Sequence, residues 1–330
     1  MSLASLVKDL RQRTGAGMMD CKKALEASDN DIDKAIEWLR ENGIAKAAKK
    51  GDRVAAEGLT KTIISGNKAV ILELNAETDF VAKNKEFLAL LEKVASGLLN
   101  SGATTLEAGL AVDIDGETIE QLITAGTATI GEKLTLRRFT ILEKTDAEAF
   151  VEYQHMGGKI SVLVKFAKEN QELGKNIAMH IAAEKPLYLN KEAVSAEVLQ
   201  KEEELIYKES VIETLKKEAA NAIKKEEEQA GKALYTKEEF AIKMEEAAQG
   251  TLPESLEKRI TGIVKGRVNK FLTQSCLLSQ GYVMDDKKTV EEIIKEANNE
   301  IEQFIRYEVG EGIVKEEVNF ADEVAAQANI

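Results

Sequence analysis

The sequence predicts an α+β protein with an N-terminal three-helix unit, a duplicated core of antiparallel hairpins with helices, and a helical coiled-coil insertion. Three observations predict this class. Apolar residues recur at helical spacing in the N-terminal segment. A hairpin, a strand and a helix then occur twice in the same order, which indicates an internal duplication. Residues 195–259 are rich in Glu, Lys and Ala with heptad-like apolar spacing, a pattern typical of paired helices.

The N-terminal unit is predicted to span residues 1–46. Its first helix is followed by a glycine-rich break and a second helix over residues 18–27. Residues 28–31 (SDND) supply N-cap candidates for a third helix, and Asn42-Gly43 is expected to end it. Because so small a unit buries little apolar surface, we expect it to lean on a partner or on the rest of the chain.

A linker and the first core subdomain come next. Residues 47–56 are predicted to form a solvated basic linker, and residues 57–140 the first subdomain. Two β-rich runs joined by a turn at residues 65–67 predict a hairpin. Asn84 then begins an amphipathic helix. Its predicted apolar face consists of Phe87, Leu88, Leu91, Val94, Ala95 and Leu98.

The second core subdomain is predicted over residues 141–290, interrupted by the insertion. A second hairpin and helix extend to Ala182, and the chain returns to mixed structure at residues 264–278. A last helix is expected from Val290 to about Ile305, and residues 304–309 are a candidate closing strand. The predicted seam of the insertion is Leu205, Ile212, Leu215, Ala219 and Ala222.

Charge and composition exclude several classes of function. The formal net charge of −13 over 330 residues repels polyanions, so direct nucleic-acid binding is disfavoured. Cys21 and Cys276 are the only cysteines and lie far apart, which suggests neither a disulfide framework nor a zinc cluster. No signal-like leader and no run of about 18 apolar residues occurs, so we expect a soluble, cytoplasmic protein without membrane contact.

No catalytic constellation is present in the sequence. A phosphate-binding loop, a dinucleotide fingerprint and a nucleophile elbow are all missing. His155 and His180 have no companion at the spacing of a metal site. His180 is expected to pack inside the fold, whereas His155 lies at a hairpin turn where packing and function are about equally favoured. We therefore expect a protein that is not an enzyme and uses no cofactor or metal.

Two motifs closely resemble signatures of the bacterial elongation factor Ts family. Residues 14–25 (TGAGMMDCKKAL) resemble its N-terminal signature, and residues 77–84 (ETDFVAKN) resemble the segment that the family uses against elongation factor Tu. Shorter matches, which bring the resemblance over most of the chain, are residues 130–132, 153–155, 177–180 and 304–312.

The resemblance implies a guanine nucleotide exchange factor that binds elongation factor Tu with GDP, disturbs its magnesium and phosphate site, and promotes GDP release so that GTP binds. It implies a ubiquitin-associated-like N-terminal domain and a C-terminal module over residues 291–330. The segment implied to dislocate magnesium is Thr78, Asp79, Phe80 and Val81. Other implied partner-binding residues are Arg13, Met18, Met19, Lys22, Lys23, Ile130, Gly131 and His155.

Without that resemblance, the segment around Phe80 has a plain structural interpretation. Thr78 is then a helix cap, Asp79 a first-turn acid favoured by the helix dipole, and Phe80 a core residue. In the functional interpretation Phe80 is exposed, because the chain turns outward after a buried strand. Met18 and Met19 form a docking surface in the same interpretation, although part of the pair is expected to pack inward. A second hypothesis makes the N-terminal unit a general adaptor module on a structural scaffold.

Overall fold

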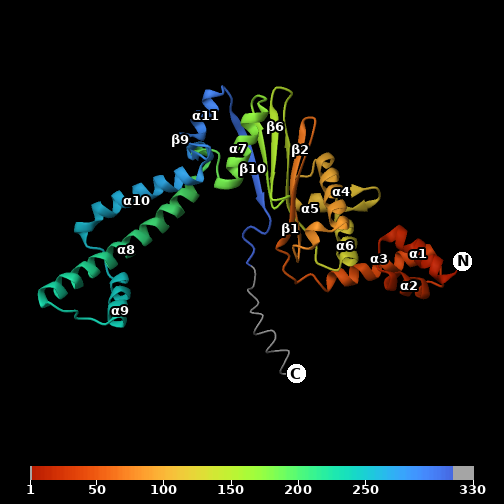
Figure 1. The fold of residues 1–330 in the computed structure, drawn as a ribbon, viewed down its shortest axis with the longest axis horizontal. Helices are drawn as coiled ribbons and strands as arrows, with labels where there is room; N and C mark the ends of the chain where they lie inside the picture. The colour runs from red at the N-terminus through yellow and green to blue at the C-terminus, as the bar shows by residue number, and fades with distance from the viewer. Residues whose placement is uncertain (1, 315–330) are drawn as a thin grey trace. The chain divides into compact units, whose positions relative to one another are not determined.

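The computed structural model describes residues 2–314, which form two compact units (Figure 1). Among the described residues, the first unit contains the chain up to Ala183 and again residues 299–314, and the second contains Glu184–Asn298. None of the described helices is long and apolar enough to cross a membrane.

The N-terminal segment forms the predicted three helices, α1 Leu3–Thr14, α2 Met18–Ala27 and α3 Ile32–Ala48. The α3 N-cap is Asp31, whose side chain accepts hydrogen bonds from the amides of Asp33 and Lys34 and so satisfies donors of the first turn. The core of this unit consists of Leu6, Leu10, Cys21, Ala24, Leu25 and Ala35.

The predicted end of α3 at Gly43 is wrong, because the helix continues to Ala48. Gly43 is buried against α6 (Ile119–Ile130), and a Cβ placed on it would lie 3.3 Å from the Cβ of Ala128. The glycine therefore permits close helix packing. Lys46, at the predicted linker boundary, is also helical and pairs with Asp20 at 2.9 Å.

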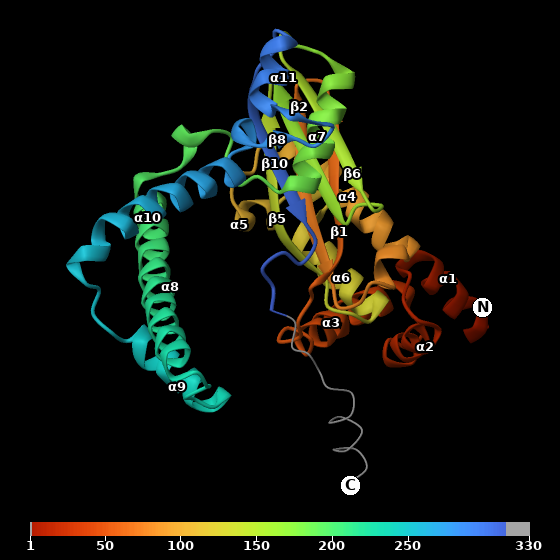
Figure 2. The same ribbon diagram turned by 60° about the vertical axis from the view of Figure 1, so that its left-hand side comes forward.

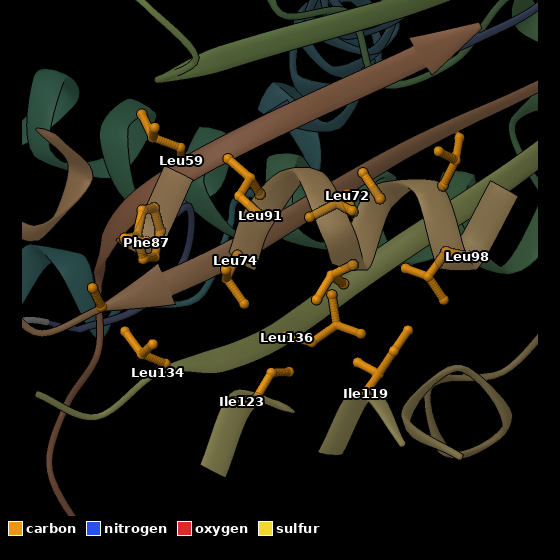
Figure 3. Packing of buried hydrophobic residues seen from close by; sticks show 14 of the residues in the cluster. Leu59, Leu72, Leu74, Phe87, Leu91, Leu98, Ile119, Ile123, Leu134 and Leu136 are labelled. Atoms are coloured by element: carbon orange, nitrogen blue, oxygen red, sulfur yellow. The ribbon is translucent and has the colours of Figure 1, made fainter. Parts of the chain in front are cut away.

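The first sheet contains the predicted hairpin and a third strand that the sequence did not reveal. Its strands, in the order β1-β2-β5, are β1 Glu57–Ser65, β2 Lys68–Ala76 and β5 Thr135–Glu143, all antiparallel. Helix α4 (Lys85–Ser101) begins after Asn84, as predicted, and packs with α6 on one face. Figure 3 shows Phe87, Leu91 and Ile119 in this core. Leu88, placed on the apolar face in the prediction, is exposed.

Short elements that the sequence did not reveal connect α4 to β5. They are helix α5 (Leu106–Leu110), the small hairpin of β3 (Asp113–Ile114) and β4 (Glu117–Thr118), and α6. Thr118 caps α6 in a capping box with Gln121.

The second sheet repeats the first and confirms the closing strand. Its order is β10-β7-β6, with β6 Ala149–His155, β7 Ile160–Phe166 and β10 Ile301–Glu308. Helix α7 (Gln171–Glu184) covers it so closely that a Cβ on Gly174 would lie 2.4 Å from Val151. His180 is fully buried on α7, as predicted.

The two sheets pack face to face within the first unit. Ala69 and Ile71 of β2 meet Phe150 and Leu163 of the second sheet, whereas Leu72 and its alternate neighbours meet α4 and α6. This is the period of two expected of a strand covered on both faces. The layers are therefore helix, sheet, sheet and helix, so the prediction of helices on one face of each sheet is confirmed.

The end of the described chain differs from the prediction. The last helix, α11, covers only Val290–Glu296, and residues up to Ile305 are not helical because β10 begins at Ile301. Residues 301–308, assigned to a C-terminal module, thus complete the second sheet. The last part of that predicted module, residues 315–330, lies outside the described residues.

The second unit consists mainly of long helices that pack against one another, confirming the predicted helical hairpin (Figure 2). Helix α8 packs against α9 and α10, and ion pairs of Glu218 with Arg259 and Glu213 with Arg267 show that α8 and α10 are antiparallel. The helices are α8 Ala196–Ala230, α9 Lys237–Ala248 and α10 Glu254–Ser275. They are bordered by η2 Lys191–Ala193, η3 Leu277–Ser279, β8 Gly281–Tyr282 and β9 Asp285–Thr289.

The predicted seam of these paired helices is wrong by about one residue on α8. Leu205 is 52% exposed, whereas Ile206, Ser210 and Thr214 are buried along α8. The buried face includes small polar residues, so a search for apolar residues alone selected the neighbouring face. Residues 264–278 are also not mixed structure for most of their length, because α10 continues to Ser275.

Candidate functional site

The segment Thr78, Asp79, Phe80 and Val81, here called the tip, joins β2 to α4. Strand β2 ends at Ala76, and a single 3-10 turn, η1 (Val81–Lys83), precedes the cap of α4. The Phe80 side chain is 80% exposed, whereas Val81 is buried in the core below it. The expectation of an exposed Phe80 is confirmed, and its interpretation as a core residue is wrong.

Thr78 is held by a carboxylate distant in sequence. Glu132 accepts one hydrogen bond from the Thr78 backbone amide (2.9 Å) and one from its hydroxyl (2.7 Å). Thr78 is therefore not the helix cap of the alternative interpretation. Asn84 has that role, accepting a hydrogen bond from the Glu86 amide at 2.8 Å. The tip is instead hydrogen-bonded to the segment that follows α6.

A second carboxylate completes this attachment. Glu77 accepts hydrogen bonds from the Lys133 backbone amide (2.6 Å) and from the Arg53 guanidinium (3.2 Å). The Lys133 ammonium group in turn donates to the backbone carbonyls of Gly51 (2.6 Å) and Arg53 (3.0 Å). The predicted linker is exposed over residues 51–54, as expected of a solvated segment, and it also contacts the site through two backbone carbonyls and the Arg53 guanidinium.

Residues 131–133 contact both the tip and the linker. Gly131, the first of them, ends α6 in a left-handed conformation with φ of 88°. The Gly131 carbonyl accepts a hydrogen bond from the Lys50 ammonium group. Ile130, the other predicted partner-binding residue here, is half-buried, whereas Gly131 is exposed.

Asp79 remains available for interactions with another molecule. Its side chain is exposed, and within residues 2–314 its carboxylate forms no hydrogen bond or ion pair. The tip therefore exposes an apolar ring next to a carboxylate, and the residues just before them are held by hydrogen bonds.

The predicted docking surface on α2 is exposed. Met18 and Met19 are 60% and 63% exposed, so the expectation that part of the pair packs inward is wrong. Cys21 of the same helix is buried in the core of the unit, and this burial raises the pKa of its thiol. The other predicted binding residues of this unit are cationic: Arg13 on α1 pairs with Asp9, and on α2 Lys22 pairs with Glu26 and Lys23 is exposed.

His155 lies at the turn between β6 and β7 and is exposed. Its Nδ1 lies 3.0 Å from the Tyr153 hydroxyl, and the neighbouring Met156 is also exposed. In the same turn, Gly158 accepts a hydrogen bond from the Thr60 amide at 2.7 Å. Because Thr60 pairs with Glu73, near the end of β2, this turn and the tip lie at the same end of the sheets.

Sequence reasoning missed the side chains that support the tip. Glu77 and Glu132 both lie within quoted motifs, but nothing local indicates that they bind across the fold. The only sequence feature that could have identified them is that Glu77 precedes Thr78 and Glu132 follows Gly131. Arg53 and Lys133 had no signal beyond positive charge.

Comparisons with known proteins agree with the two motifs. Residues 77–311 match the family model described as elongation factor TS, and residues 1–51 match that of the elongation factor Ts, mitochondrial, N-terminal domain. Elongation factor Ts of Acholeplasma laidlawii (strain PG-8A) is 45% identical over 327 residues, covering 99% of this chain and 98% of that protein. The chain therefore belongs to the elongation factor Ts family.

Proposed function

We propose that this chain binds elongation factor Tu in its GDP-bound and nucleotide-free forms and promotes GDP release, so that GTP then binds. The family is one of nucleotide exchange factors for elongation factor Tu. The observation that carries the proposal is the 80% exposed Phe80 ring on a tip that is anchored on both sides. An exposed aromatic ring on a fixed loop is suited to insertion into a partner.

Exchange requires that the factor and GDP weaken each other's binding, and thermodynamic linkage makes this coupling reciprocal. The tip does not need to touch GDP. Guanine nucleotides are held by backbone amides of a phosphate loop together with a magnesium ion. A ring inserted between neighbouring partner elements displaces that loop and breaks several of these contacts together.

Asp79 adds a charge to this action. With no partner among the described residues, its carboxylate is available near the partner's magnesium and phosphate site. A negative charge there repels the phosphates of the bound nucleotide. We therefore propose different roles for the two side chains: Phe80 displaces the partner's phosphate loop, and Asp79 makes the electrostatic environment of the bound phosphates less favourable.

Two further surfaces are proposed to hold the partner while the tip acts. Met18 and Met19 offer soft apolar side chains flanked by Lys22 and Lys23, a combination suited to a partner helix. The turn at His155 offers a second contact at the same end of the sheets as the tip. Neither surface needs catalytic chemistry. We propose a cytoplasmic binding protein that is not an enzyme and contacts neither nucleic acid nor membrane.

The test is stopped-flow release of a fluorescent GDP derivative from elongation factor Tu. Burying a Phe side chain contributes about 1.5–3 kcal/mol. If that energy is expressed in the transition state, Phe80→Ala slows catalysed release about tenfold to a hundredfold. Phe240→Ala, a substitution of a partly exposed Phe on α9, is the matched control and leaves the rate unchanged. A Phe80→Ala rate equal to wild type overturns the proposal.

A further inference from the structure

We propose that Glu132 is a positioning residue for nucleotide exchange, acting through Thr78 to orient Phe80. This inference rests on the proposed function and extends it to a residue that does not itself form the tip. The observation that supports it is that the Glu132 carboxylate accepts hydrogen bonds from both donors of Thr78, its backbone amide and its hydroxyl.

Both oxygens of Glu132 are used. One accepts from the Thr78 amide at 2.9 Å and the other from the Thr78 hydroxyl at 2.7 Å. Hydrogen bonds to a charged acceptor are stronger than neutral ones, and two on one residue fix its orientation as well as its place. Phe80 follows two positions later. Its backbone is therefore held by Glu132 on one side and by the buried Val81 side chain on the other.

The support is reciprocal. The Glu132 side chain binds the backbone of Thr78, and the Glu77 side chain binds the backbone of Lys133 at 2.6 Å. Two neighbouring residues on each segment thus exchange hydrogen bonds. The Leu134 amide continues the attachment by donating to the Thr127 hydroxyl at 3.1 Å, inside the core. Glu132 is consequently held against α6 rather than swinging with the tip.

A Glu132→Ala protein still has the Phe80 side chain, but the backbone that carries this ring is no longer held. Water then satisfies the Thr78 donors, and the loop between Ala76 and Val81 samples other conformations. An exchange rate falls in proportion to the fraction of molecules with the ring in the productive orientation. We expect Glu132→Ala to lower the kcat of exchange about tenfold while KM for elongation factor Tu with GDP changes less than about twofold.

Conservative variants separate orientation from charge. Thr78→Ser keeps both donors, so its kcat is expected to fall less than that of a variant without the hydroxyl. Thr78→Val removes the hydroxyl and lowers kcat, because only the backbone donor remains. Glu132→Gln keeps one carbonyl acceptor, so its kcat is expected to lie between those of the wild type and of Glu132→Ala. Glu143→Ala is the matched control, since Glu143 is an exposed glutamate on β5 that pairs with Lys68 at the far end of the sheet.

The decisive measurement combines substitutions in one protein. In a Phe80→Ala background, Glu132→Ala is expected to cause no further loss of kcat, because there is no ring left to orient. A purely structural role predicts equal fold-losses in both backgrounds, together with a fall in melting temperature that tracks the activity. Additive losses overturn the inference.

The two proposals fail in distinguishable ways. If Phe80→Ala exchanges GDP at the wild-type rate, the proposed function itself fails. If Phe80→Ala is slow but Glu132→Ala behaves like Glu143→Ala, only the positioning role of Glu132 fails.

Discussion

Replacing Glu73 with alanine tests how the two sheets are joined. Glu73 lies on the face of β2 that packs against the second sheet, so its fully buried carboxylate lies between the two sheets. It accepts hydrogen bonds from the Arg138 Nε (2.6 Å), the Gly310 amide (2.8 Å) and the Arg137 guanidinium (3.1 Å). The side chain of Asn75 donates a further bond at 3.1 Å. One carboxylate therefore ties β2, β5 and the segment after β10.

The magnitude follows from what the substitution leaves behind. Removing one partner of a buried ion pair costs about 3–5 kcal/mol, because the remaining charges lose their partner. Arg137 and Arg138 are about one-quarter exposed and regain water, which favours the lower value. The Gly310 amide, in contrast, loses its acceptor. We expect a loss of about 3 kcal/mol in the free energy of unfolding, or about 6–12 °C in the melting temperature of a unit this size.

The assay is urea and thermal denaturation followed by circular dichroism. Glu73→Gln keeps an acceptor but not the charge, so its loss of stability is expected to be smaller. The control is Glu143→Ala, whose exposed ion pair with Lys68 is worth at most about 1 kcal/mol. A Glu73→Ala protein as stable as the control refutes the reasoning, because the buried network then contributes nothing net.

Two further predictions concern packing and pH. Gly174→Ala is expected to cost about 1–3 kcal/mol in urea denaturation, because the added Cβ lies 2.4 Å from Val151, whereas Gly262→Ala, with open space around it on α10, gains about 0.5–1 kcal/mol. A Gly174→Ala protein as stable as wild type contradicts the close packing. The backbone hydrogen bond from Thr145, assisted by Lys165 and Glu302, lowers the pKa of Glu148 to about 2. Since this lies below the unfolded value of about 4.3, the stabilisation is present above that pH and is lost as pH falls toward 2. Glu148→Gln should therefore flatten the pH dependence of the urea midpoint between about pH 5 and 2, and an unchanged slope contradicts the assignment.

Local signals predicted many elements because their causes are local. The hairpin turn before β2, the Asn84 cap and the repeated hairpin-helix order were all visible in the sequence and are confirmed. Gly43 shows the limit of such signals. A glycine after a helical run indicates a helix end, but it serves equally well where another helix approaches closely, and only the neighbour Ala128 distinguishes the two.

The same limit explains the seam of α8. Ile206 and Leu205 are adjacent apolar residues, and the sequence favoured Leu205 because its face contains more apolar side chains. The buried face instead includes Ser210 and Thr214. Small polar residues fit where two helices approach, so the choice of face depends on the partner helix and not on α8 alone.

The sequence by itself determined the family and the position of the tip, because both depend on residues that are contiguous in the chain. It also placed Phe80 where a buried strand turns outward. Only the tertiary structure decided that Thr78 is anchored rather than capping a helix, since its acceptor Glu132 lies 54 positions away. The physical reason is that a hydrogen bond selects whichever acceptor the folded chain brings within reach. The same fold leaves Asp79 without a partner among residues 2–314 and keeps the Phe80 side chain outside the core.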